Sequence, residues 1–440
     1  MDAFVIKGGR RLSGRIRVGG AKNAALPLMA AALLTDEPIV LHDVPDLTDI
    51  RSMTRLLAEL GCPRDDEDAE RPGRMRLRTI DRSLIHARYS LVSTMRAGVC
   101  VLGPLLARRG RARVAMPGGC AIGQRPIDLH LRGLEALGAR IELEGGDVVA
   151  QAPHGGLRGA RIFLGGPFGS TVLGTANVLC AATLATGTTL IESAACEPEI
   201  VDLAALLSKM GARINGAGSP RILVEGVDAL GPAEHRVMPD RIEAGTYMCA
   251  AAITGGELAL ENCPVDALMA LNSCLESVGV GVQTTGGDDP MRATVRITPA
   301  RTLRPAMVTT QPYPGFPTDL QAQMLAMLCL ADGNSVVTEK VFPERFLHVA
   351  ELTRMGARLY RQGPTVVISG VRGLVGAPVM ASDLRASAGL VLAGLAARET
   401  TIVRRVYHLD RGYQRMDRSL ASLGADVVRV DDRDLDRIDE

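Results

Sequence analysis

The chain has 440 residues, of which 47% are hydrophobic and 22% are charged, a normal balance for a globular protein. This length predicts two domains of about 200 residues each. The formal net charge is +1, and 3% of the residues are aromatic. Such a composition argues against nucleic-acid binding, because it offers neither a basic field nor many rings on which bases could stack.

The nine cysteines are scattered along the chain, and none forms a C-x-x-C pair. This pattern fits neither a disulfide framework nor a zinc site, so it favours a reducing cytoplasm and no bound metal. Residues 1–4 do not resemble the start of a signal peptide. The most apolar run, residues 172–190, is interrupted by Asn177 and by several Thr and Gly, so we predict a buried helix and strand and no membrane span.

One short pattern recurs six times along the chain: a helix-like run ending in an apolar residue, then Gly, then a small or apolar residue. The six glycines lie 77, 73, 68, 77 and 68 residues apart, and they are Gly61, Gly138, Gly211, Gly279, Gly356 and Gly424. Each glycine is suited to end a helix in the left-handed conformation, and the residues beyond it are predicted to form a strand.

Each unit also holds an Ala/Leu-rich helical run followed by a strand, as in 23–34 with 38–41, 175–184 with 188–191, and 386–397 with 400–403. Such a unit places helices on one face of a sheet and cannot bury its apolar face alone. We therefore predict an α/β protein built of α+β repeats, with three βαβαββ-like units in each of two globular domains.

The domains are predicted to comprise residues 22–238, and residues 1–21 together with 239–440. Pro239 marks the boundary, because it separates the third unit from the helix that is predicted to follow.

Residues 117–130 combine a thiol, three glycines, an arginine and two prolines immediately before a helix-like run. Glycine frees the backbone and proline stiffens the ends, so we predict a mobile loop that carries Cys120. The guanidinium of Arg125 is suited to lower the pKa of the thiol, which would make Cys120 a nucleophile or a proton donor. The same pattern also fits a tight surface turn with an inert cysteine.

Several predicted helix beginnings carry polar or charged residues, at 19–23, 93–96, 317–319 and 382–385. Helix N-termini favour anions, and cations placed there strengthen the preference. If the units pack around pseudo-threefold axes, these positions converge on a pocket for a phosphorylated, carboxylated small molecule, lined by Lys22, Arg96, Arg125, Arg385 and Arg411. Asp319 would then take a proton from a hydroxyl. Taken singly, each arginine fits an ordinary surface ion pair equally well.

Nine motifs, taken in order, resemble the UDP-N-acetylglucosamine 1-carboxyvinyltransferase family from end to end. They lie at 20–23, 93–96, 117–130, 197–202, 239–243, 316–319, 345–349, 382–387 and 408–413. The resemblance implies an inside-out α/β barrel of the enolpyruvyl transferase type. It implies transfer of the enolpyruvyl group of phosphoenolpyruvate to the 3-hydroxyl of UDP-N-acetylglucosamine with release of phosphate, the first committed step of peptidoglycan precursor synthesis. It further implies a cytoplasmic enzyme without cofactor and a target of fosfomycin.

The resemblance also assigns roles to individual residues. Cys120 is implied to be the proton donor to the enol carbon and Asp319 the general base, with Lys22 and Arg411 completing the catalytic set. The implied phosphoenolpyruvate ligands are Lys22, Arg125, Arg385 and Arg411. The remaining predicted substrate-binding residues, most of them on the sugar nucleotide, are Asn23, Arg96, Pro126, Ile127, Asp128, Leu129, Gly165, Gly166, Pro167, Phe168, Val341 and Asp383.

Two positions depart from the family pattern. Cys196 stands where a basic residue is usual, and Pro167 replaces a small polar residue beside the implied diphosphate. Because proline donates no backbone hydrogen bond, Pro167 leaves open the alternative that the chain is a paralogous transferase acting on another nucleotide. The related transferase of shikimate 3-phosphate lacks the cysteine loop. The near-zero net charge and the intact acid, base and cation positions argue against a non-catalytic repeat scaffold and against a nucleic-acid end-processing relative.

Overall fold

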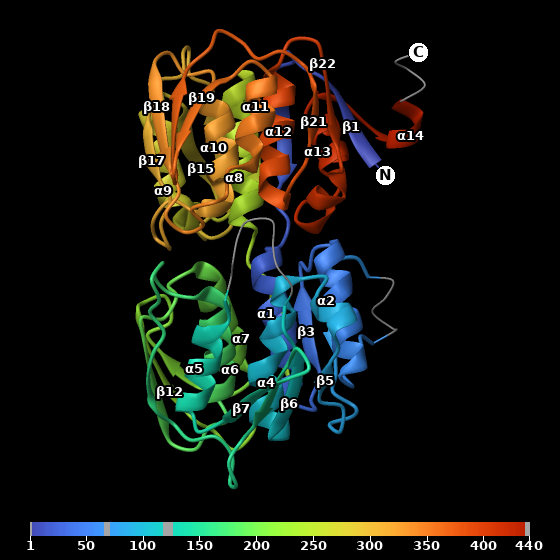
Figure 1. Ribbon diagram of the computed structural model, residues 1–440, viewed down its shortest axis with the longest axis vertical. Coiled ribbons are helices and arrows are strands. Elements are labelled where there is room, and N and C mark those ends of the chain that lie inside the picture. The colour runs from blue at the N-terminus through green and yellow to red at the C-terminus, as the bar shows by residue number, and fades with distance from the viewer. Residues whose placement is uncertain (1, 66–70, 118–125, 436–440) are drawn as a thin grey trace. The chain divides into compact units, whose positions relative to one another are not determined.

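The computed structural model describes residues 2–65, 71–117 and 126–435 (Figure 1). The described chain divides into two compact units, one of residues 2–19 and 239–435 and the other of residues 20–117 and 126–238. They are named here the Asp319 unit and the Lys22 unit. Each contains three of the six sheets found among the described residues.

The three sheets of the Asp319 unit have four strands each, ordered β15-β16-β14-β2, β19-β20-β18-β17 and β23-β1-β22-β21. Their strands are β1 (Asp2–Lys7), β2 (Ser13–Arg17), β14 (Glu257–Cys263), β15 (Gly281–Gly286), β16 (Ala293–Thr298), β17 (Met307–Thr309), β18 (Asn334–Thr338), β19 (Arg358–Gln362), β20 (Thr365–Ser369), β21 (Pro378–Met380), β22 (Thr400–Arg404) and β23 (Asp426–Asp431). In each sheet, two antiparallel pairs are followed by one parallel pair.

The sheets of the Lys22 unit are ordered β7-β8-β6-β5, β11-β12-β10-β9 and β4-β3-β13. Their strands are β3 (Ile39–His42), β4 (Met75–Leu77), β5 (His86–Ala87), β6 (Arg111–Ala115), β7 (Arg140–Glu144), β8 (Asp147–Gln151), β9 (Arg161–Phe163), β10 (Thr188–Glu192), β11 (Arg213–Asn215), β12 (Arg221–Glu225) and β13 (Ala233–Arg236). Each sheet again ends in one parallel pair. The shared pairing pattern confirms the predicted fold of six repeated units.

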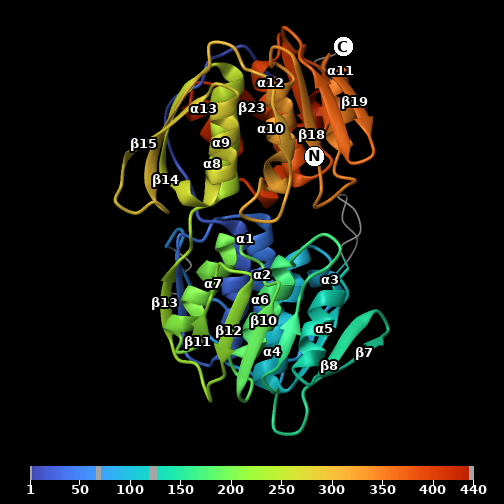
Figure 2. The same cartoon turned by 90° about the vertical axis from the view of Figure 1, so that its left-hand side faces the viewer.

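The helices fill the space beside these sheets (Figure 2). The Lys22 unit holds α1 (Lys22–Ala31), α2 (Thr48–Glu59), α3 (Tyr89–Val92), α4 (Leu102–Arg109), α5 (Asp128–Ala136), α6 (Val172–Ala182) and α7 (Pro198–Lys209). The Asp319 unit holds α8 (Arg241–Thr254), α9 (Met269–Ser277), α10 (Gln321–Leu328), α11 (Leu347–Arg354), α12 (Leu384–Ala396), α13 (Met416–Ser422) and α14 (Asp432–Leu435).

The most buried helices carry mostly apolar residues on every side, as core helices do. In the Asp319 unit, α8, α10 and α12 pack against one another and are buried along nearly their whole length. An acidic residue stands at or just before the start of each of these helices: Asp240, Asp319 and Asp383. These three carboxylates therefore stand at the starts of helices that pack against one another.

The six repeat glycines confirm the predicted helix ends, because all of them have φ between 74° and 108°. A strand begins within two residues of each glycine except Gly61. Among the described residues between Gly61 and β4, the β pairing is limited to the isolated bridge between Arg64 and Leu77. The prediction of an immediate strand was wrong at that repeat.

The helix and strand predictions are confirmed with shifted ends. The predicted helix 23–34 is α1 followed by a 3-10 turn at Ala32–Leu34, and residues 172–190 form α6 and β10. The expected helix beginnings near 96 and 318 are 3-10 segments, Arg96–Val101 and Thr318–Leu320. Among the described residues, no helix combines the length and apolarity needed to cross a membrane.

Candidate functional site

Asp319 lies in the 3-10 turn Thr318–Leu320, directly before α10, and its carboxylate faces two guanidinium groups. Arg345 Nη1 donates a hydrogen bond to Asp319 Oδ1 at 2.8 Å, and Arg385 Nε donates to Asp319 Oδ2 at 3.3 Å. The Asp319 side chain is 26% exposed, whereas those of Arg345 and Arg385 are 7% and 1% exposed. The carboxylate thus stays accessible while both of its cations are buried.

Arg385 is the most buried cation of this cluster, and two of its nitrogen atoms make no hydrogen bond to the described residues. Its Nη1 and Nη2 atoms are buried, and none of the described residues accepts a hydrogen bond from them. Burial lowers its pKa, but Tyr413, Asp319 and Asp240 together raise it above the ordinary value, so the group stays charged. A buried cation with unused donors is a site for an anion.

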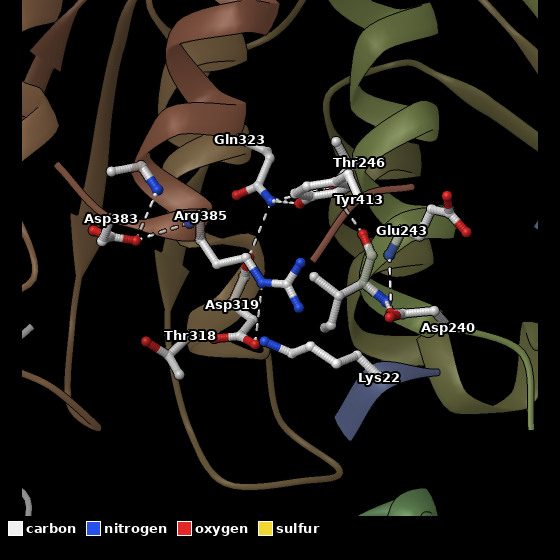
Figure 3. A network of polar contacts seen from close by, with 12 residues as sticks. Lys22, Asp240, Glu243, Thr246, Thr318, Asp319, Gln323, Asp383, Arg385 and Tyr413 are labelled. Carbon is white, nitrogen blue, oxygen red and sulfur yellow. Dashed lines mark hydrogen bonds and ion pairs between the residues drawn. The ribbon is translucent and has the colours of Figure 1, made fainter. Parts of the chain in front are cut away.

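A network of uncharged groups lies beside Arg385 (Figure 3). The amide nitrogen of Gln323 lies 3.0 Å from Thr246 Oγ1, 3.1 Å from Tyr413 Oη and 3.1 Å from the carbonyl oxygen of Asp319, so its two hydrogens are shared among these three acceptors. The Arg385 guanidinium lies over the Tyr413 ring, 5.2 Å from its centroid. These contacts fix the backbone of Asp319 and the plane of Arg385, which leaves the geometry of the pair little freedom.

Asp383 supports the same cluster from the start of α12. Its carboxylate caps the helix by accepting from the backbone N–H of Arg385 and of Ala386, and it lies 3.8 Å from Arg345 Nη2. His348 is buried nearby, and burial, partly opposed by Asp383, lowers its pKa to about 4. His348 is therefore neutral at physiological pH.

Asp240 and Glu243 stand at the start of α8. Asp240 caps the helix, and the Glu243 carboxylate accepts from the backbone N–H of Gly19 at 2.8 Å. Burial and the neighbouring Asp240 raise the Glu243 pKa to about 7, against the Gly19 hydrogen bond and Arg385, which lower it. Glu243 consequently titrates in the physiological range.

In the Lys22 unit, Lys22 is the first residue of α1 and is only 7% exposed. Its Nζ lies 3.1 Å from Asp49 Oδ2, and Asp49 is 4% exposed near the start of α2. Asn23 and Arg96 are half-buried in the same unit. The Asp49 carboxylate therefore holds this buried ammonium in one position.

The predicted nucleotide contacts at 126–129 and 165–168 meet within the Lys22 unit. The residues from Gly166 to Gly169 form a tight turn closed by hydrogen bonds between their backbone groups at 2.8 and 3.1 Å. A Cβ added to Gly166 would lie 3.1 Å from Leu129 Cδ1, so the turn packs on the start of α5. Arg132 of α5 donates to the carbonyls of Phe163 and Gly165 at 2.8 and 3.0 Å, which ties the turn to the helix.

The chain matches the family model described as EPSP synthase (3-phosphoshikimate 1-carboxyvinyltransferase) over residues 6–420. A UDP-N-acetylglucosamine 1-carboxyvinyltransferase of Anaeromyxobacter sp. (strain Fw109-5) is 53% identical over 98% of this chain and 99% of its own length. The enzyme of the same name from Gluconacetobacter diazotrophicus is 55% identical over 98% of this chain and all of its own. The chain belongs to the UDP-N-acetylglucosamine 1-carboxyvinyltransferase family.

Solved structures share the fold of this family member at lower identity. The enolpyruvyl transferase NikO from Streptomyces tendae superposes with a TM-score of 0.85 at 24% identity, over 98% of this chain and 99% of that one. EPSP synthase from Acinetobacter baumannii gives a TM-score of 0.76 at 16% identity, over 98% of this chain and 100% of that one. These likenesses bear on architecture alone.

Within each unit of this UDP-N-acetylglucosamine 1-carboxyvinyltransferase family member, the structure brings some of the predicted site residues together. Asp319, Arg385 and Asp383 form one cluster, and Leu129 contacts the turn at Gly165 to Phe168 in the other unit. Arg411 ends a 3-10 helix, Val406–Arg411, two residues before Tyr413. Cys120 and Arg125 lie outside the described residues, so the predicted loop and its thiol stay predictions.

Two charged residues of the cluster were missed by the sequence reasoning. Arg345 opens the family motif at 345–349 but received no role, and Glu339 belongs to no motif. Glu339 is fully buried and accepts hydrogen bonds from Thr310, Thr318 and two backbone N–H groups. A single buried carboxylate at the end of β18 leaves no periodic pattern, so only the place of Arg345 in a motif could have signalled this part of the cluster.

Pro167 has a simple structural account. It is the second residue of the Gly166–Gly169 turn, where proline is favoured and where the backbone N–H is not used to close the turn. Cys196 is half-buried, and burial together with Glu197 raises its pKa.

Proposed function

We propose that this protein transfers the enolpyruvyl group of phosphoenolpyruvate to the 3-hydroxyl of UDP-N-acetylglucosamine and releases phosphate. The proposal places it in the cytoplasm at the first committed step of peptidoglycan precursor synthesis, and hence in cell wall formation, cell shape and division. The observation that carries it is the cluster of Asp319, Arg345 and Arg385 in a chain whose full-length relatives bear that enzyme name.

The chemistry assigns distinct tasks to the residues of the cluster. Addition of an alcohol across the enol double bond removes a proton from oxygen, forms a C–O bond, and delivers a proton to the terminal carbon. Asp319 would take the hydroxyl proton, and Cys120 would supply the proton to carbon. Loss of phosphate and of one proton from that carbon then restores the double bond.

The cations serve binding and charge stabilisation. The unused Nη1 and Nη2 donors of Arg385 suit the phosphate or carboxylate of phosphoenolpyruvate, with Lys22, Arg125 and Arg411 as further proposed ligands. Asn23, Arg96, residues 126–129, residues 165–168, Val341 and Asp383 are proposed to hold the sugar nucleotide. We propose residues 22–238 as one domain and 1–21 with 239–440 as the other.

The decisive experiment measures phosphate release by the purified full-length chain with phosphoenolpyruvate and each of three acceptors. UDP-N-acetylglucosamine is expected to support turnover, whereas shikimate 3-phosphate is not. UDP-glucose serves as the control for recognition of the N-acetyl group. Turnover with another nucleotide alone would replace this proposal by that of a paralogous transferase.

A second measurement tests the thiol. Fosfomycin, an epoxide phosphonate, is expected to label Cys120 and none of the other eight cysteines, as read by mass spectrometry of tryptic peptides. Burial raises the pKa of Cys100, Cys249, Cys263 and Cys329 to about 12, so these thiols are poor nucleophiles. Label on any of them would contradict the role given to Cys120.

A further inference from the structure

A chain of hydrogen bonds runs from Glu339 to the carboxylate of Asp319. Thr318 Oγ1 donates to Glu339 Oε2 at 2.9 Å and lies 3.2 Å from Arg345 Nη1, which also donates to Asp319 Oδ1 at 2.8 Å. Glu339 is 0% exposed and Arg345 is 6% exposed, so little water competes for these contacts.

The direction of every hydrogen bond in this chain is determined by chemistry. A carboxylate accepts only and a guanidinium donates only, so the Thr318 hydroxyl must give its proton to Glu339 and accept from Arg345. The second Glu339 oxygen accepts from Thr310 Oγ1 at 2.6 Å and from the backbone N–H of Val341 and Phe342 at 2.8 and 2.9 Å. Glu339 is therefore saturated, and it orients Thr318, which orients Arg345.

We propose that Glu339 is a positioning residue for catalysis, acting through Thr318 and Arg345 on the Asp319 carboxylate. This inference rests on the proposed function, in which Asp319 is the general base. Glu339 touches neither substrate nor reacting atoms in this scheme. It sets where Arg345 holds Asp319, and a shift of that carboxylate lowers the rate of proton removal more than it lowers substrate affinity.

The variant that isolates the effect is Glu339→Gln. To keep accepting from Thr310 and the two backbone N–H groups, the amide must turn its oxygen toward them. Its NH2 group then faces Thr318, so both neighbours of the hydroxyl are donors and the direction of the chain is broken. The shape of the side chain and the turn at 340–342 are preserved, which separates positioning from folding.

Three threonine variants complete the test. Thr318→Val removes the hydroxyl, and Thr318→Ser retains it. Thr338→Val is the matched control, because Thr338 directly precedes Glu339 but bonds to Thr365 Oγ1 at 3.1 Å, outside the chain of contacts. The double variant Glu339→Gln with Thr318→Val tests whether the two residues act as one unit.

The experiment measures kcat and KM for both substrates with the full chain. Calorimetry gives the fraction of each preparation that binds UDP-N-acetylglucosamine, and kcat is expressed per mole of that fraction. Glu339→Gln and Thr318→Val are each expected to lower kcat about tenfold or more with KM changes below about threefold. Thr318→Ser and Thr338→Val should stay within about twofold of the wild type, and the double variant should match the worse single variant.

Wild-type kcat in either Thr318→Val or Glu339→Gln overturns the inference, as does an equal loss in Thr338→Val. If Glu339→Gln does not fold, the contrast between Thr318→Val and Thr318→Ser decides alone. A wild-type chain that releases no phosphate with UDP-N-acetylglucosamine refutes the proposed function instead, and the comparison of variants then uses the acceptor that supports turnover.

Discussion

In the Asp319 unit the charged side chains hold one another, whereas in the Lys22 unit the predicted nucleotide contacts at 165–168 are held through their backbone groups, which bond to one another and to Arg132. Asp319 is fixed by two guanidinium groups, and the cluster extends to Glu339 through side-chain hydrogen bonds. The turn from Gly166 to Gly169 is closed by its own peptide groups. A site built from side chains is sensitive to a single changed atom, while one built from the backbone tolerates replacement of side chains but not of its packing.

The largest effect is expected from Asp319→Asn, because it removes the proposed base while keeping its size. We expect kcat to fall by about a thousandfold, with the dissociation constant of UDP-N-acetylglucosamine changed by less than about threefold. Steady-state phosphate release and calorimetry measure the two quantities. Asp288→Asn, an exposed position in the same unit, is the control. Comparable losses in both variants would show that Asp319 has no special role.

The sequence allowed this cluster to be predicted only in part. The start of α12 was evident because Asp383 precedes Arg385 in a family motif, and the repeat glycines located the helix ends from spacing alone. Arg345 and Glu339 come from the segment after β18, and only folding brings them beside Thr318. Their pairing depends on contacts between residues about 20 to 27 positions apart, which no local periodicity encodes.

In the Lys22 unit the largest effect is expected from replacing Asn177, and it is expected on stability. Asn177 is fully buried, donates to the carbonyl of Val99 at 2.9 Å and accepts from the N–H of Gly103 at 2.7 Å. Asn177→Leu leaves both backbone groups buried without that partner, so we expect the free energy of unfolding to fall by about 3 kcal/mol. Urea denaturation measures the loss, with the exposed Asn215→Leu as control.

The same variant sharpens the contrast between the units. If no reacting group of the Lys22 unit lies near Asn177, folded Asn177→Leu should keep a kcat within about twofold of the wild type. A tenfold loss of kcat at temperatures where Asn177→Leu is fully folded would mean that this network, which also contacts His130 Nδ1 at 2.9 Å, takes part in catalysis.

Glu243 predicts a dependence of stability on pH that originates in the Asp319 unit. Burial and Asp240 raise its pKa to about 7 in the folded chain, above the value of 4.5 expected when unfolded. Between pH 4.5 and about 7, the folded protein therefore holds a proton on Glu243 that the unfolded chain has released. The contribution of Glu243 to the free energy of unfolding is fully present below pH 4.5 and is lost as the pH rises through 7.

Glu243→Gln removes the titration and keeps an oxygen to accept from Gly19. We expect the variant to be more stable than the wild type by about 2 kcal/mol at pH 8, with a smaller difference at pH 5.5. Urea midpoints at the two pH values measure this difference. An identical pH dependence in both proteins would show that Glu243 does not titrate near neutrality in the folded chain.

The smallest effect is expected at Pro167, and its smallness is informative. The turn is closed by Gly166 and Gly169, and Pro167 is exposed, so Pro167→Ser should change the KM for UDP-N-acetylglucosamine by less than about twofold.

Gly165→Ala is the matched change two residues away, because its Cβ would lie 2.5 Å from the Phe163 ring and 3.0 Å from Ser193 Oγ. The Arg132 guanidinium lies over the Phe163 ring, 5.9 Å from its centroid, so moving the ring disturbs the side chain that holds the carbonyls of Phe163 and Gly165. This variant should therefore raise the KM by about fivefold or more. If Pro167→Ser has the larger effect, the side chain at 167 governs recognition, and the description of this region as a backbone-held site is wrong.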